Sequence, residues 1–169
     1  MPLFGSSQYG YLAASTVAIA VVFALVARWS RNGRRTRASL LGGAAAGTVN
    51  IGLDTIAHHQ GWWRYVEATT PFGPLIYYAL AGLGFAAFAL AAGNLRRRFG
   101  PVVIPVFTAA LAVYGTIRDH RLADTLHLMA FKSSAAVAFW DGLFEYVIPF
   151  LVAYAVTASS VPDSDAAVV

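Results

Sequence analysis

The chain has 169 residues, 58% of them hydrophobic and only 12% charged, with a formal net charge of +4. This length suits one domain, and the composition lies outside the range of ordinary soluble proteins. The chain has no cysteine, which excludes disulfides, thiolate nucleophiles and Cys-ligated metal centres. Long apolar runs between short charged segments predict an all-α polytopic membrane helix bundle, whose basic residues serve membrane topology and not binding to nucleic acid.

Five apolar runs follow one another, each near the ~20 residues that a helix needs to cross ~30 Å of hydrocarbon. We predict five transmembrane helices, over residues 11–29, 40–58, 75–93, 102–117 and 134–157. The second run begins with Gly43 and Gly47, a spacing that permits close contact with another helix. Residues 1–158 are expected to form one integral membrane domain, and residues 159–169 a disordered cytoplasmic tail.

Two of the connecting segments carry structural signals of their own. Residues 60–70 form a predicted loop with the aromatic side chains that favour the headgroup layer, before a helix start marked by Pro71 and Pro74. Residues 118–132 are too polar to span, and their apolar side chains Leu122, Leu126 and Met129 fall on one helical face. This pattern predicts a short external helix lying in the interface.

The distribution of basic residues predicts the orientation in a bacterial inner (plasma) membrane. Eight of the twelve lie beside the connections after the first and third runs, namely Arg28, Arg31, Arg34, Arg35, Arg37, Arg96, Arg97 and Arg98. The positive-inside rule then places the N-terminus outside and the C-terminus in the cytoplasm. No basic residue precedes Arg28, so the first run is expected to remain as an anchor and not to be cleaved as a signal peptide.

Polar residues at four-residue spacing mark the interior of the bundle. Such a step drifts only ~40° around a helix, so Asn50, Asp54 and His58 form one stripe, and Asp141 and Glu145 form another. With a rise of ~1.5 Å per residue, Asp54 and Asp141 lie at similar distances from the outer ends of their helices. Asn50 and Glu145 lie deeper in the membrane, again at similar depths. Ionisable groups in spans face the bundle interior. We therefore expect one polar pocket that opens outward.

Candidate side chains for binding a substrate surround these acids. Arg118 is the expected compensating cation, with Arg64 as a second candidate. The full set of predicted binding residues is Asn50, Trp62, Trp63, Tyr77, Tyr114 and Arg118. The tryptophan and tyrosine pairs also suit an aromatic belt at the membrane surface. Pro149 has no N–H to donate to the carbonyl of Glu145. We predict a kink that frees this carbonyl beside the acid; the alternative is that Pro149 only bends the helix and has no functional role.

Acid–base chemistry on a lipid is the first functional hypothesis. Paired carboxyls in unequal environments separate into an acid and a base. Asp54 and Glu145 are the expected proton donors or acceptors, His58 the base or orienting group, and Asp141 a partner. Such a site would protonate an alkene or epoxide of an isoprenoid or another lipid, as a cyclase or isomerase does, and would need no cofactor.

Several alternatives stay open. A metal site would draw on His120, Asp124 and His127, but the sequence has no HExxH motif, and no metal is predicted. The polar stripes also suit a small proton or solute transporter. A homo-oligomer, or a non-catalytic subunit in which buried charges hold helices in register within a membrane complex, is a further possibility.

The segment DTIAHHQGWWRY and the proline turn after it carry a resemblance to a known family. Over about Asp54–Tyr78 the chain resembles the bacterial lycopene cyclase-domain proteins, which act on carotenoids in the membrane. The resemblance implies functional roles for Asp54 and Trp63 only, because the paired acids that the family carries after its proline have no counterpart in PFGPLIYY. As a whole, the chain is similar in composition to small polytopic bacterial membrane proteins.

Overall fold

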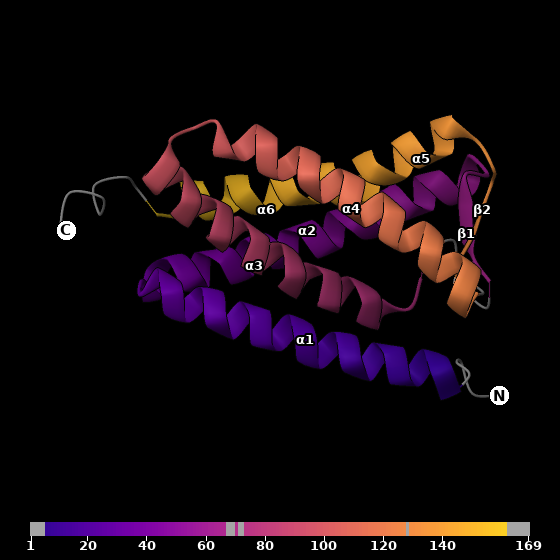
Figure 1. Ribbon diagram of the computed structural model, residues 1–169, viewed down its shortest axis with the longest axis horizontal. Coiled ribbons are helices and arrows are strands. Elements are labelled where there is room, and N and C mark those ends of the chain that lie inside the picture. Colours follow the sequence, from indigo (N-terminus) through magenta and orange to yellow (C-terminus); the bar gives the residue numbers. More distant parts are fainter. Residues whose placement is uncertain (1–5, 67–69, 71–72, 128, 162–169) are drawn as a thin grey trace.

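The computed structural model describes residues 6–66, 70, 73–127 and 129–161. Helices dominate it: α1 (Ser6–Ser30), α2 (Gly33–His59), α3 (Leu75–Phe99), α4 (Val103–Leu126) and a last helix of three parts, α5 (Ala135–Asp141), the π-helical η1 (Gly142–Val147) and α6 (Ile148–Ser159). Strands β1 (Trp63–Tyr65) and β2 (Met129–Phe131) pair antiparallel. Figure 1 shows this sheet at one end of the bundle, beside the start of α5.

Within the described residues, four helices are long and apolar enough to cross a membrane, over residues 10–30, 33–59, 75–99 and 135–159. They correspond to the first, second, third and fifth predicted runs, and they are compatible with a membrane protein. The fourth predicted run, 102–117, lies in α4, which continues into charged sequence. Length and composition therefore support four spanning helices but do not establish a fifth.

Two predictions about the connecting segments are wrong. The polar segment 118–132 is not a separate interfacial helix, because α4 runs unbroken to Leu126 and β2 follows. One of its polar side chains, Asp119, is buried in the bundle. The arginine-rich segment 30–38 is largely helical, since α2 begins at Gly33, where the Asn32 side chain accepts a hydrogen bond from the Arg35 amide at 3.0 Å. Residues 162–169 of the predicted tail, and Pro71, lie outside the described residues.

Glycines set the distance between α2 and α3. A Cβ atom on Gly43 would overlap the backbone carbonyl of Gly82, and one on Gly47 would lie 2.7 Å from the carbonyl oxygen of Tyr78. The close contact predicted from the Gly43–Gly47 spacing is thus confirmed. This packing matters for the site, because it brings the C-terminal half of α2 against the first turn of α3.

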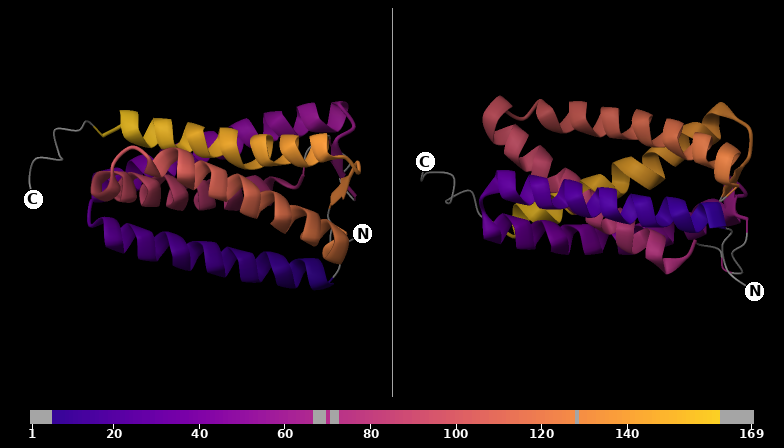
Figure 2. Two further views of the ribbon diagram at one scale, coloured as in Figure 1. Left: turned by 45° about the horizontal axis from the view of Figure 1, so that its top comes forward. Right: turned by 60° about the horizontal axis from the view of Figure 1, so that its bottom comes forward.

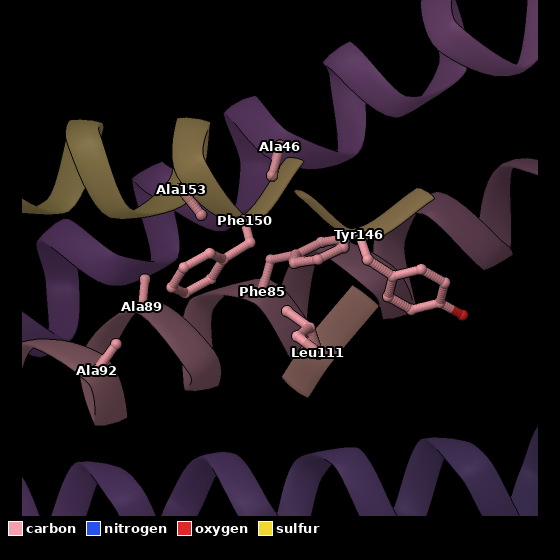
Figure 3. Close-up of a cluster of buried hydrophobic side chains, with 8 residues drawn as sticks. All are labelled: Ala46, Phe85, Ala89, Ala92, Leu111, Tyr146, Phe150 and Ala153. Atoms are coloured by element: carbon pink, nitrogen blue, oxygen red, sulfur yellow. The ribbon is translucent and has the colours of Figure 1, made fainter. Parts of the chain in front are cut away.

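Two apolar clusters hold the bundle on either side of its polar residues. The larger lies between α2, α3, α4 and the last helix, and Figure 3 shows its members: Ala46, Phe85, Ala89, Ala92, Leu111, Tyr146, Phe150 and Ala153. The smaller lies beneath the sheet and joins Ala57, Trp63 and Val137. Both views in Figure 2 keep the sheet at one end of the bundle, with the last turn of α6 at the other.

The packing of α2 on α3 predicts that a larger side chain destabilises the protein at Gly43 but not at an exposed glycine of the same helix. Gly43→Val should destabilise the protein by about 1–3 kcal/mol, because the new side chain would force α2 away from α3. Gly52→Val is the matched control, since a Cβ atom there meets nothing within 4 Å. Unfolding in mixed micelles measures both variants, and equal losses would contradict the close-contact argument.

Candidate functional site

The carboxyl group of Asp54 accepts hydrogen bonds from three aromatic side chains. The indole Nε1 of Trp63 donates to Oδ1 at 2.7 Å, and the hydroxyl of Tyr65 donates to Oδ2 at 3.1 Å. The hydroxyl of Tyr78 also donates to Oδ2. Asp54 is only 1% exposed. We call these four residues the Asp54 cluster; they join α2, β1 and α3 at one point.

The turn after α2 directs the side chains of Trp63 and Tyr65 toward Asp54. The helix ends at His59, Gly61 adopts a left-handed φ of 67°, and the Trp62 amide bonds back to the Ala57 carbonyl at 3.0 Å. Side chains alternate along a strand, so Trp63 and Tyr65 share a face while Arg64 points to the exposed side. Pairing of Trp63 with Phe131 and Tyr65 with Met129 fixes this register.

Burial keeps the aromatic donors of Asp54 in their protonated form. It raises the pKa of the Tyr65 phenol well above its usual value, and the nearby carboxyl groups of Asp54 and Glu145 raise it further. The hydroxyl of Tyr78 is fixed from the other side, because it accepts the Gly73 amide at 2.7 Å. The Asp54 carboxyl therefore accepts hydrogen bonds from three donors whose positions are fixed.

Asn50 and Glu145 meet one turn deeper. The Asn50 side-chain amide donates to Oε2 of Glu145 at 3.0 Å, which confirms the common depth predicted for these residues. Oε1 of Glu145 has no partner that meets hydrogen-bond geometry in the described part of the chain, although the Asp54 carboxyl is near enough to interact with it. Glu145 is 9% exposed and therefore combines burial with an unoccupied oxygen.

A π-helical turn presents Glu145. Pro149 has no N–H to bond the Glu145 carbonyl, and the chain widens to a π-helix over Gly142–Val147, in which the Ile148 amide bonds to the Leu143 carbonyl. The kink predicted at Pro149 is therefore a widened turn. Such insertions are frequent at functional sites, because they change the angle at which side chains leave the helix.

Asp119 forms a third polar centre on α4. Both Nε and Nη2 of Arg118 donate to its Oδ1, at 2.9 and 2.7 Å, and the Tyr146 hydroxyl donates to its Oδ2 at 2.5 Å. The ring of Tyr146 rests on Gly115, where any Cβ atom would collide with it. The ion-pair partner of Arg118 is thus Asp119, and not one of the acids for which Arg118 was predicted as the counter-charge.

A cavity of about 330 Å³ connects these centres, and we call it the tyrosine cavity. It lies between α1, α3 and α4. Glu145, Asn50, Asp119 and Arg118 supply its polar lining, and its aromatic lining is Tyr11, Tyr65, Tyr77, Tyr78 and Tyr114. Apolar side chains of α1 complete the wall. Of the two acids in the lining, Asp119 is paired with Arg118, whereas Glu145 has no basic partner within salt-bridge distance among the described residues.

The remaining predicted site residues lie elsewhere. His58 is exposed beside His59, because two steps of ~40° carry it off the face that holds Asn50. Trp62 stacks on Trp140 with ring centroids 5.1 Å apart, which makes it a packing residue. Asp141 is fully buried outside the lining of the cavity; the Thr116 hydroxyl is near enough to influence its carboxyl, but neither oxygen has a partner in hydrogen-bond geometry among the described residues.

Sequence reasoning missed Tyr65, Asp119 and Tyr146 as parts of the polar pocket. The alternation in Trp63–Tyr65 could have indicated the first, but the others depend on contacts between helices that no spacing reveals. Within the described residues, no group of three His, Asp or Glu side chains lies close enough to hold a metal ion.

Comparison with protein-family models, curated proteins and solved structures finds no match to this chain. The cyclase resemblance over Asp54–Tyr78 therefore stays a prediction, and functional argument must come from the geometry of the site.

The contacts of the Asp54 cluster predict that loss of the Tyr78 hydroxyl lowers the stability of the fold. Tyr78→Phe should destabilise the protein by about 1–3 kcal/mol, because it removes a donor to buried Asp54 and the acceptor of the Gly73 amide. Hydrogen exchange of that amide should accelerate. Tyr114→Phe is the control, as Tyr114 is largely exposed, and unchanged exchange at Gly73 in Tyr78→Phe would contradict the assignment.

Proposed function

We propose that this protein is a cofactor-independent membrane enzyme that isomerises or cyclises an unsaturated lipid, with Glu145 as its general acid. The observation that carries the proposal is the carboxyl of Glu145, which lines the tyrosine cavity and accepts from Asn50 at Oε2, while its Oε1 has no hydrogen-bond partner among the residues that the structure describes. A carboxyl in apolar surroundings that can still reach a substrate is the arrangement that general acid catalysis requires.

In the proposed reaction Glu145 gives one proton to the substrate and later takes one proton back from it. The O–H bond of Glu145 breaks as the π electrons of a substrate double bond take the proton, which leaves a carbocation on the neighbouring carbon. In isomerisation an adjacent C–H bond then breaks, its electrons form the new double bond, and its proton returns to the Glu145 carboxylate. In cyclisation a second double bond attacks the cation before that proton is lost. No oxidant, reductant or metal enters the balance.

The aromatic lining suits such an intermediate. The faces of tyrosine rings attract cations within ~6 Å, and Tyr65, Tyr77 and Tyr78 all line the cavity. Asp54, which accepts three hydrogen bonds, positions Tyr65 and Tyr78. Arg118 and Asp119 at the side of the cavity neutralise one another and leave the acidic function to Glu145.

The apolar cluster favours an enclosed reaction site over a conducting path. Phe85, Leu111 and Phe150 pack against one another beyond the Asn50–Glu145 pair, and Figure 3 shows the Tyr146 hydroxyl pointing away from them. A proton or solute that reached Glu145 would therefore meet packed hydrocarbon. The lining by α1 and α4, both rich in exposed apolar side chains, suits a substrate that arrives from the lipid.

For the membrane arrangement we propose five spans in a bacterial inner membrane, with α4 as the fourth. The N-terminus then lies outside and the C-terminus in the cytoplasm, since the arginine-rich connections lie at the end remote from the sheet. The tyrosine cavity would lie in the outer half of the bilayer.

The catalytic role of Glu145 predicts a specific loss. Purified protein in lipid nanodiscs should convert at least one member of a panel of linear polyprenes, acyclic carotenoids and unsaturated lipids, and in D₂O the product should carry deuterium at the protonated carbon. Glu145→Gln should lower turnover by about 10²–10⁴-fold, because the amide keeps the size of the side chain but not its acidity.

Asp141→Asn is the matched control, as it changes an acid buried outside the cavity lining; its turnover should stay near that of the unaltered protein. Full activity in Glu145→Gln, or no product and no deuterium uptake across the panel, would overturn the proposal. A stoichiometric membrane partner retained after mild solubilisation would then favour a non-catalytic subunit.

The proposed topology predicts that the two ends of the bundle lie on opposite sides of the membrane and differ in their access to an impermeant thiol reagent. The chain has no cysteine, so Ser133→Cys beside the sheet and Gly33→Cys at the start of α2 each introduce one exposed thiol. An impermeant maleimide added to intact cells should label Ser133→Cys only, and label Gly33→Cys only after permeabilisation. The reverse pattern would place the cavity in the inner half of the bilayer.

A further inference from the structure

A second cavity, of about 340 Å³, lies at the end of the bundle remote from the sheet. We call it the arginine cavity. Arg35 from the first turn of α2 lines it together with Arg96 and Arg97 from the last turn of α3, and Tyr154 and Thr157 of α6 add hydroxyl groups. No acidic side chain lines it among the described residues. The sequence alone indicated only a topology signal at these arginines.

Neighbouring side chains hold two of the arginines in place. Nη1 of Arg96 donates to the Tyr154 hydroxyl at 2.8 Å, and Nη2 of Arg97 donates to Oδ1 of Asn94 at 2.5 Å. Asn94 is itself buried. A guanidinium carries five N–H donors, so the Asn94 contact orients Arg97 and leaves further donors of that residue for a ligand. The Tyr154 hydroxyl, which accepts from Arg96, retains its own proton for donation.

The rest of the arginine cavity's lining is apolar. It consists of Ala89, Leu90 and Gly93 of α3, Ala158 of α6, and Val161 just after that helix. A cavity lined by both cationic donors and hydrocarbon matches a molecule with an anionic head and an apolar chain. Guanidinium groups recognise phosphate well, because their donors pair with two oxygens at once.

We propose that the arginine cavity binds the phosphate group of an anionic amphiphile, such as a phospholipid of the adjacent leaflet. Retention of positive charge on one side of a membrane requires only that basic residues lie near the helix ends. It does not require three arginines from two helices to line one cavity with hydroxyls from a third. Arg37 and Arg98 meet the topology requirement equally well and do not line it. The proposal is independent of the chemistry at Glu145.

The test uses the purified full-length protein in non-ionic detergent. Native mass spectrometry and thermophoresis measure the binding of short-chain phosphatidylglycerol, of diacylglycerol with the same chains, and of glycerol phosphate. Phosphatidylglycerol should bind at least about tenfold more tightly than diacylglycerol, and Arg35→Gln and Arg97→Gln should each weaken it by about tenfold. Arg37→Gln and Arg98→Gln remove the same charge outside the cavity and should change binding by less than about twofold.

The two sources of phosphate separate in the same assay. Weak binding of glycerol phosphate assigns the site to a lipid headgroup, whereas binding as tight as that of phosphatidylglycerol assigns it to a free phosphate ester. Equal losses in all four variants would show diffuse charge attraction and overturn the proposal. Equal affinity for diacylglycerol and phosphatidylglycerol would also overturn it. Circular dichroism of each variant confirms that the helices remain formed.

Discussion

The burial of Asp54 is the constraint on which the rest of the structure depends. A carboxyl group enclosed in apolar surroundings is costly unless donors surround it. Its donors come from three places in the chain, Trp63 and Tyr65 on β1 and Tyr78 on α3. The same contacts therefore close the end of the bundle, hold the sheet on α2 and fix the start of α3. Loss of this centre would release all three elements together.

Close packing of the helices allows the donor side chains to reach Asp54. Gly43 and Gly47 let α2 lie against α3, so Tyr78 reaches Asp54 across a short gap. On the opposite side, the widened turn before Pro149 brings Glu145 against Asn50. Asp54 accepts three hydrogen bonds, while Oε1 of Glu145 has no hydrogen-bond partner in the described part of the chain. Packing thus separates two acids that lie about one turn apart in depth: Asp54 is a structural anchor, and Glu145 is the proposed proton donor.

The bundle is chemically divided along its length. The tyrosine cavity lies toward the sheet, the arginine cavity lies at the other end, and the large apolar cluster packs between them. The division follows from the cost of polar groups in hydrocarbon, which confines them to sites with partners or to the helix ends. It separates the proposed reaction site from the proposed phosphate site within one small bundle.

The sequence by itself determined the helical class, the positions of four apolar helices, the close contact at Gly43 and the common depth of Asn50 and Glu145, because hydrophobic runs and helical spacing are local properties. It could not place Tyr78 on Asp54 or Tyr146 on Asp119, since those bonds depend on how separate helices rotate against one another. Helical drift also carried His58 off the predicted face. Only the tertiary structure decided that Asp54 accepts three hydrogen bonds and that Glu145 accepts one from Asn50, because these contacts join separate helices and the sheet.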